Sequence, residues 1–136
     1  MSVARFLIDT SGLARILQKE HRAAWADFLS AGVVAVCPVV ELEFLYSARS
    51  LADRLDKQRL LAQVFAWVPM ADRAYARAAE IQEALTRRGE HRSAGAVDLL
   101  IAATAERHQL IVLSEDRDFQ TVAAVTGQPV RRITVP

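Results

Sequence analysis

The sequence Arg5-Phe6-Leu7-Ile8-Asp9-Thr10-Ser11-Gly12 sets a pattern that recurs along the chain. Its three consecutive apolar residues predict a strand that is buried on both faces. The strand ends at Asp9, and the next residues turn the chain into a helix that we expect to begin near Leu13. Ligands of open α/β sheets bind beyond the carboxyl ends of the strands. Asp9 is therefore either part of a site or, like Thr10 and Ser11, a cap of the following helix.

Apolar runs and helical patterns alternate along the rest of the chain. Further strands are expected at Val33–Cys37, Trp67–Pro69, Leu110–Leu113 and Arg132–Val135. Helices are expected at 13–18, 21–31, 39–48, from Ser50 onward, from a cap at Asp72 to Gly89, at 99–108 and at 119–125. This alternation predicts an α/β domain with a parallel sheet and helices on both faces.

The composition predicts one globular domain over residues 1–136. Of these 136 residues, 52% are hydrophobic, which is enough for a single core. No apolar run is long enough to cross a bilayer, and the N-terminus lacks the pattern of a signal peptide. Cys37 is the only cysteine, which fits a reduced, cytoplasmic protein and argues against a thiolate zinc site. The three scattered histidines argue against a histidine-based metal site.

Acidic residues occupy the positions where such a fold places a site. Asp9 and Asp116 follow predicted strands, Asp98 starts a predicted helix, and Glu43 lies one turn into another helix. Strand tips and the starts of the following helices share one edge of a parallel sheet, so these four acids can converge. Each also has a simpler role as a cap, a turn residue or a solvated side chain. The apolar neighbours of Glu43 favour its burial.

A divalent metal ion would explain why carboxylates gather at one edge. Carboxylates packed together repel one another, and without a compensating cation they take up protons instead of staying ionised. Mg²⁺ and Mn²⁺ prefer hard oxygen ligands and can support the attack of water on a phosphodiester. The pattern of acids therefore indicates a metal site for chemistry on phosphate.

Four motifs together resemble the PIN-domain ribonucleases, specifically the VapC-type toxins of bacterial toxin–antitoxin pairs. They are LIDTSGL at 7–13, ELEFLYSA at 41–48, VDLLIAATAERHQL at 97–110 and VLSEDRDF at 112–119. The resemblance covers essentially the whole chain. It implies a three-layer α/β/α sandwich with a parallel five-stranded sheet, flavodoxin-like in layout. It also implies an endoribonuclease that depends on Mg²⁺ or Mn²⁺, a VapB-type antitoxin that blocks the pocket, and a homodimer.

The resemblance also implies roles for individual residues. The acids expected to act in catalysis are Asp9, Glu43, Asp98 and Asp116, and those expected to bind metal are Asp9, Asp98, Asp116 and Asp118. Ser11 and Ser114 match small hydroxyl positions that support the site. Glu41 competes with Glu43 for one family position, and Glu43 is preferred because Ser47 follows it at the spacing of a small residue in the family.

Arginines near the predicted acids are candidates for binding RNA phosphates. They are Arg87, Arg88, Arg92 and Arg117. For the loop before Asp98, an ordinary solvated turn is the alternative. Aromatic residues make up only 7% of the chain, which argues against a broad stacking platform for single strands. We therefore expect a structured RNA, such as tRNA or rRNA, to be recognised mainly through phosphates and shape.

Apolar residues between 41 and 65 are candidates for a groove that receives an amphipathic antitoxin helix. They are Phe44, Leu45, Tyr46, Leu51, Leu55 and Leu61. The alternative for most of them is burial in the core. An arginine of the antitoxin would then pair with the acids of the pocket.

Two other classes of protein stay open at this point. A phosphate-handling α/β domain of another kind would need a lysine near the site, but Lys19 and Lys57 are the only lysines and neither follows a strand. A non-catalytic PIN-like binding module would be expected to have lost acids that this chain retains.

Overall fold

A computed structural model describes residues 3–134 and contains the predicted alternation of strands and helices. Five strands form one sheet in the order β3-β2-β1-β4-β5, and every pairing is parallel. The strands are β1 (Phe6–Ile8), β2 (Val34–Val36), β3 (Ala66–Trp67), β4 (Ile111–Leu113) and β5 (Val130–Arg131). The predicted α/β fold class with a parallel five-stranded sheet is confirmed.

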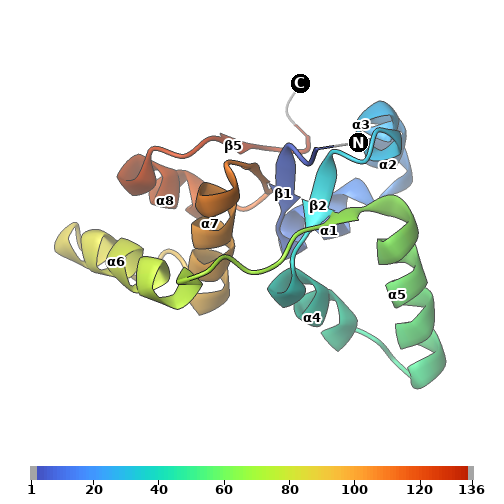
Figure 1. Cartoon of the computed structure of the whole chain (residues 1–136), viewed down its shortest axis with the longest axis horizontal. Helices are drawn as coiled ribbons and strands as arrows, with labels where there is room; N and C mark the ends of the chain where they lie inside the picture. The colour runs from blue at the N-terminus through green and yellow to red at the C-terminus, as the bar shows by residue number, and fades with distance from the viewer. Residues whose placement is uncertain (1–2, 135–136) are drawn as a thin grey trace.

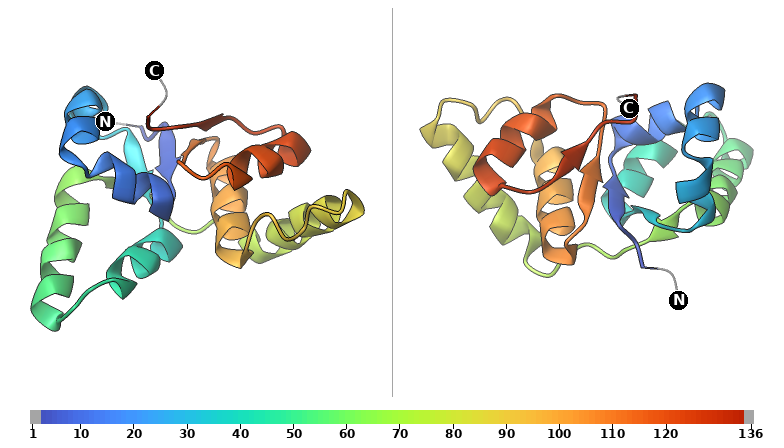
Figure 2. Two further views of the ribbon diagram at one scale, coloured as in Figure 1. Left: turned by 180° about the vertical axis from the view of Figure 1, so that it is seen from behind. Right: turned by 90° about the horizontal axis from the view of Figure 1, so that it is seen from above.

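The helices pack on both sides of this sheet. They are α1 (Thr10–Ile16), α2 (Lys19–Ala24), α3 (Ala26–Ser30), α4 (Pro38–Tyr46), α5 (Leu51–Val64), α6 (Ala74–Arg87), α7 (Ala96–His108) and α8 (Asp118–Thr126). Helices α6, α7 and α8 contact one another on one side of β1 and β2, and α1 to α5 lie on the other side (Figures 1 and 2). None of the helices in the described part of the chain has the length and apolar character needed to cross a membrane.

Strand β1 is the centre of the sheet and of the core. Its three residues are completely buried, and Phe6 pairs with Val34 on one side and with Ile111 on the other. From β1 the chain proceeds outward through β2 and β3, then crosses back to β4 and β5 on the opposite side. The order of strands therefore reverses between β1 and β4. In such sheets this reversal point opens the crevice in which ligands bind.

The turn after β1 is tighter than the sequence predicts. Helix α1 begins at Thr10 instead of near Leu13, because the Asp9 carboxylate caps it by accepting from the Gly12 N–H at 2.7 Å. Glycine permits this geometry: a Cβ at position 12 would lie 2.6 Å from the Leu113 carbonyl oxygen. The start of α1 is thus pressed against the end of β4.

The single helix expected over 21–31 is two helices, α2 and α3, which meet at Trp25. The backbone leaves the helical region there (φ −100°, ψ 7°), and the indole is 4% exposed. Its ring lies 5.7 Å from the Phe6 ring and 5.2 Å from the Phe28 ring, centroid to centroid. The break lets Trp25 turn into the core, a tertiary contact that outweighs the helical pattern.

Two other expectations about element ends are wrong. Asp72 does not cap α6, because Arg73 precedes the helix in a left-handed conformation (φ 61°) without a side-chain cap. The last strand is Val130–Arg131 and not Arg132–Val135, because the N–H groups of Ile133 and Thr134 bind a side chain and leave the sheet. Val135 lies outside the described residues.

Candidate active site

Asp9 lies at the carboxyl end of the central strand and is 3% exposed. Its Oδ2 accepts from the Ser114 hydroxyl at 2.7 Å, and the Ser11 hydroxyl lies 3.0 Å from both carboxylate oxygens. Burial raises the pKa of Asp9, and the hydrogen bonds from Gly12, Ser114 and Ser11 oppose that shift without cancelling it. Asp9 is therefore a helix cap, and it is also a buried carboxylate held in one orientation.

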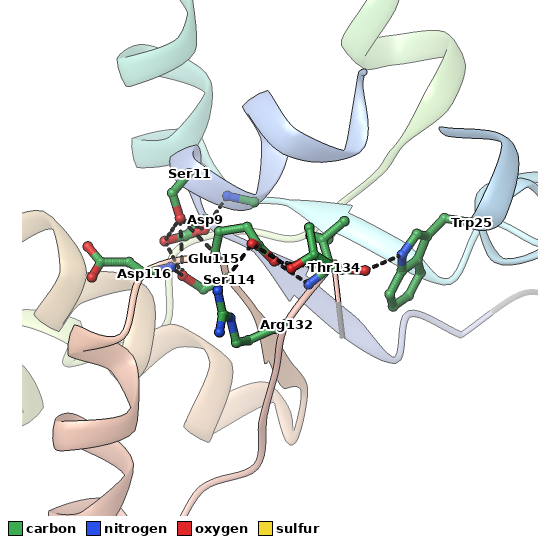
Figure 3. Close-up of polar contacts among 10 residues, drawn as sticks. Asp9, Ser11, Trp25, Ser114, Glu115, Asp116, Arg132 and Thr134 are labelled. Atoms are coloured by element: carbon green, nitrogen blue, oxygen red, sulfur yellow. Dashed lines mark hydrogen bonds and ion pairs between the residues drawn. The ribbon is translucent and has the colours of Figure 1, made fainter. Parts of the chain in front are cut away.

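The hydroxyls of Ser11 and Ser114 join the turn after β1 to the loop after β4 (Figure 3). They lie 3.2 Å from each other. Ser11 accepts from the Glu115 N–H at 3.2 Å, and Ser114 accepts from the Asp116 N–H at 2.9 Å. These two small side chains fix the relative positions of two loops that lie more than a hundred residues apart in sequence.

Asp98 lies in the first turn of α7 and is partly buried. Burial raises its pKa to about 6, and the negative charges of Asp9, Asp116 and Glu43 add to the shift. Those charges come from β1, from the loop after β4 and from α4. The structure thus brings the four acids to one edge of the sheet.

Glu43 faces this edge from α4, where its carboxylate accepts a hydrogen bond from the Thr10 hydroxyl. The expected burial of Glu43 is wrong: its side chain is exposed, and the neighbouring Leu42 is 63% exposed. This part of α4 therefore faces solvent. Glu41 instead lines a different hollow together with Leu61, so Glu43 is the glutamate at the acidic edge.

The loop after β4 brings two further carboxylates to the site. Asp116 is partly buried, and its Oδ1 accepts from the Asp118 N–H at 2.9 Å. Asp118 opens helix α8, where burial raises its pKa and the charge of Asp116 adds to the effect. Asp118 therefore extends the acidic cluster on the side of Asp116.

The donor set has the chemistry of a site for Mg²⁺ or Mn²⁺. It offers carboxylate oxygens, and the pKa values of Asp9 and Asp98 are raised mainly by burial and further by neighbouring carboxylates, whose repulsion a cation would relieve. Within residues 3–134, no three His, Cys, Asp or Glu side chains already stand close enough together to hold a metal ion. The carboxylates therefore share an edge but are not gathered around one point.

The four candidate arginines differ in their surroundings. Arg87 pairs with Glu83 at 3.6 Å at the end of α6 that projects away from the sheet (Figure 1), and Arg88 pairs with Glu90 at 2.7 Å. Arg92 and Arg117 are exposed, and neither forms an ion pair within the described range 3–134. The latter two have their charges available for an external anion.

Helices α4 and α5 carry an exposed apolar face. Tyr46 is 92% exposed, Leu51 73% and Leu55 42%. Leu45 and Leu61 are buried in the core and do not belong to this face, and Phe44 is partly buried. We call the exposed residues Leu42, Tyr46, Leu51 and Leu55 the α4–α5 face. Exposed large apolar side chains on neighbouring helices make these residues candidates for contact with a protein partner.

Glu115 is a residue of this region whose role the sequence does not indicate. Its carboxylate accepts from the N–H groups of Ile133 and Thr134 at 2.7 and 3.0 Å. Although burial opposes ionisation, the hydrogen bonds from these residues and the nearby charge of Arg132 hold its pKa below the ordinary value. Only the position of Glu115 within an acidic run pointed to it, and nothing in the sequence named its partners.

A parallel sheet with acids at its reversal point defines an open α/β domain that binds ligands beyond the carboxyl ends of its strands. Comparison with known proteins gives the family. The PIN domain matches residues 6–125. Ribonuclease VapC21 of Mycobacterium tuberculosis is 39% identical over 132 residues, covering 97% of this chain and 96% of the relative. Ribonuclease VapC2 of the same species is 36% identical, covering 98% and 96%. The chain belongs to the PIN-domain family, within its VapC-type branch.

Solved structures agree on the fold. A DNA-bound VapBC from Salmonella typhimurium superposes with a TM-score of 0.77 at 20% identity, covering 96% of this chain and 98% of that one. VapBC-5 from Mycobacterium tuberculosis superposes with a TM-score of 0.61 at 25% identity, covering 99% and 100%. The topology described above is therefore that of VapC-type proteins over nearly the full chain.

Proposed function

We propose that this protein is a metal-dependent endoribonuclease toxin that hydrolyses phosphodiester bonds of RNA at the edge formed by Asp9, Glu43, Asp98 and Asp116. The observation that carries the proposal is that the charges of Asp9, Asp116 and Glu43, from three other elements, add to the effect of burial, which raises the pKa of Asp98 to about 6. Maintaining such repulsion in a folded protein costs stability, which a cationic cofactor would restore. The ribonuclease names of the VapC relatives support the same activity.

In this proposal Asp9, Asp98 and Asp116 hold Mg²⁺ or Mn²⁺, with Asp118 beside Asp116. When bound, the ion supplies positive charge for activating water and for offsetting the charge that develops at phosphorus. The serine hydroxyls keep the Asp9 oxygens oriented, so that this carboxylate needs no rearrangement when the substrate arrives. Glu43, exposed and oriented by Thr10, is the residue that can align the attacking water.

The RNA approaches through its phosphates. Arg92 and Arg117 offset the repulsion between the polyanion and the acids, because no ion pair within residues 3–134 neutralises their charges. Arg88 contributes less to RNA binding, because Glu90 already pairs with it at 2.7 Å. Arg87 contributes least, because α6 carries it away from the sheet.

The partner is a VapB-type antitoxin, and the toxin forms a homodimer. Similar solved structures are those of VapBC from Salmonella typhimurium and VapBC-1 from nontypeable Haemophilus influenzae, which supports a partner of that kind here. The α4–α5 face includes Leu42 and Tyr46 of the helix that carries Glu43, and its exposed apolar side chains suit an amphipathic helix. An arginine from the antitoxin would pair with the acids and compete with the metal ion.

The test is to incubate the purified protein with total RNA and Mg²⁺ or Mn²⁺ and to map the new 5′ ends. We expect cleavage at a small number of positions, loss of cleavage with chelator, and loss of cleavage in Asp98→Asn. Glu41→Gln is the matched control, since Glu41 lies away from the edge and should leave cleavage intact. Binding of RNA with no metal-dependent cleavage would instead favour a non-catalytic PIN module.

A further inference from the structure

A cluster of hydrogen bonds lies directly behind Asp116 and joins the loop after β4 to residues 132–134, which we call the C-terminal segment. The Glu115 Oε1 accepts from the N–H groups of Ile133 and Thr134, and Oε2 accepts from the Thr134 hydroxyl at 3.0 Å. The Glu115 side chain is 8% exposed. A nearly buried carboxylate with three donors is a fixed contact and not a solvated surface charge.

The C-terminal segment is itself anchored in the core. Ile133 is 5% exposed, and its carbonyl oxygen accepts from the Trp25 indole N–H at 3.2 Å. The Arg131 guanidinium lies 4.7 Å from the centroid of the Trp25 ring. The donors that bind Glu115 are therefore held in place by the aromatic core around Trp25 and do not depend on Glu115 alone.

Glu115 and Asp116 extend to opposite sides of their loop (Figure 3). The Glu115 carboxylate faces Thr134, and Asp116 faces away from the C-terminal segment. Both residues also donate their backbone N–H groups to serine hydroxyls, Glu115 to Ser11 and Asp116 to Ser114. Fixing Glu115 on one side therefore fixes the direction in which the next side chain leaves the backbone.

Arg132 contributes little to this contact. Its Nη2 lies 3.5 Å from the Glu115 Oε2, at the limit of a hydrogen bond, and its Nε is buried without a partner among residues 3–134. The two backbone N–H groups and the Thr134 hydroxyl are closer to Glu115 and account for its anchoring. Arg132 is thus a nearby charge whose removal should leave the anchor intact.

We propose that Glu115 is a positioning residue, which directs Asp116 toward the acidic edge by binding the backbone N–H groups of the C-terminal segment. The inference rests on the proposed function for its consequence in catalysis, but the positioning itself is a property of the protein without metal. Residues that orient metal-binding side chains are commonly worth 10- to 100-fold in metal affinity.

The experiment compares Glu115→Ala with the matched control Arg132→Met, which keeps the apolar stem of the arginine. The first measurement is amide hydrogen exchange of Asp116 and Asp118 in metal-free protein, and the second is the Kd for Mn²⁺ by calorimetry. We expect Glu115→Ala to speed exchange at both amides by about tenfold or more and to raise the Kd by about 10- to 100-fold. Arg132→Met should change both quantities less than about twofold.

Glu115→Gln is a second variant in case Glu115→Ala does not fold. It keeps an oxygen that can accept from the two N–H groups, so it should give intermediate effects on both measurements. Unchanged exchange in Glu115→Ala, or equal changes in Arg132→Met, would overturn the inference. Faster exchange with an unchanged Kd would also overturn it, because Glu115 would then be only a structural anchor. If the unmodified protein bound no Mn²⁺, the metal site of the proposed function would fail, whereas unchanged exchange in Glu115→Ala beside normal Mn²⁺ binding would overturn only the role of Glu115.

Discussion

The two neighbouring strands that carry acids at their tips, β1 and β4, end in different ways. After β1 the chain enters α1 at once, and Asp9 is fixed by residues within three positions, apart from Ser114. After β4 a loop of four residues precedes α8, which has no side-chain cap. That loop is held by Ser11 and by the C-terminal segment, both more than fifteen residues away. One half of the site is therefore built locally, and the other depends on distant parts of the chain.

The largest loss of RNA cleavage should come from a change at Asp9, in the half of the site that is built locally after β1. Asp9→Asn keeps the size of the side chain and an oxygen for the Gly12 N–H but removes the charge. We expect kcat/KM for RNA cleavage to fall by about a hundredfold or more, since several kcal/mol of interaction with the ion are lost. The measurement is single-turnover cleavage of a mapped substrate. Asp118→Asn, at the start of α8 just after the β4 loop, should cost less, and equal losses would remove the distinction between the two tips.

The tight contact between α1 and β4 should be the next most sensitive feature. Gly12→Ala places a Cβ 2.6 Å from the Leu113 carbonyl oxygen, so that the helix must move away. We expect the free energy of unfolding to fall by about 1–3 kcal/mol, as measured by urea denaturation. Gly95→Ala, at a position where a Cβ would meet no atom within 4 Å, is the control and should cost less.

The pKa of Asp98 responds first to burial and then to the charges of Asp9 and Asp116 at the two strand tips, so its titration should report both effects. The pKa of Asp98 is raised from 3.8 to about 6 in the folded protein, so the native state binds this proton more tightly than the unfolded state does. Without divalent metal, stability should therefore rise as the pH falls from above 6 toward 4, by on the order of 1 kcal/mol after screening by solvent.

The measurement is the urea midpoint against pH in the presence of chelator. Asp98→Asn should flatten the curve in that window, because the titrating group is gone. A curve with the same slope in the variant would assign the proton uptake to another residue and contradict the electrostatic picture of the edge.

The smallest effects should come from the arginines that meet RNA. Arg117→Gln, in the β4 loop, and Arg92→Gln should each weaken RNA binding severalfold at low salt. Each should also lower the slope of log Kd against log salt by about one. Binding is measured with Ca²⁺ in place of Mg²⁺ to suppress cleavage. Arg87→Gln is the control, and an equal loss in all three variants would mean that net charge, not position, controls RNA affinity.

The sequence was sufficient for the fold because the fold depends on local patterns. The apolar run 6–8 and the acid after it predict a buried central strand with a site at its tip, and the structure has Phe6 to Ile8 fully buried. Strand tips share an edge in any parallel sheet, which is why four dispersed acids could be selected together. Their catalytic and metal-binding roles stay predictions.

The break between α2 and α3, the end of the last strand and the exposure of Glu43 could not be predicted, because they depend on contacts between distant residues. The break at Trp25 follows from packing against Phe6, and the early end of the last strand follows from Glu115 binding residues 18 and 19 positions later. The exposure of Glu43 depends on which way α4 leaves the sheet. No periodicity or cap signal in the sequence carries that information.

Cys37 has a practical consequence for experiments on the partner. It is the only cysteine in the chain, it is completely buried between β2 and α4, and burial raises the pKa of its thiol. Such a thiol reacts slowly with maleimides and iodoacetamides. The variant Tyr46→Cys, at a position that is 92% exposed on the α4–α5 face, would therefore accept a single fluorophore without removal of the native cysteine. Its emission would report the arrival of an antitoxin helix in real time.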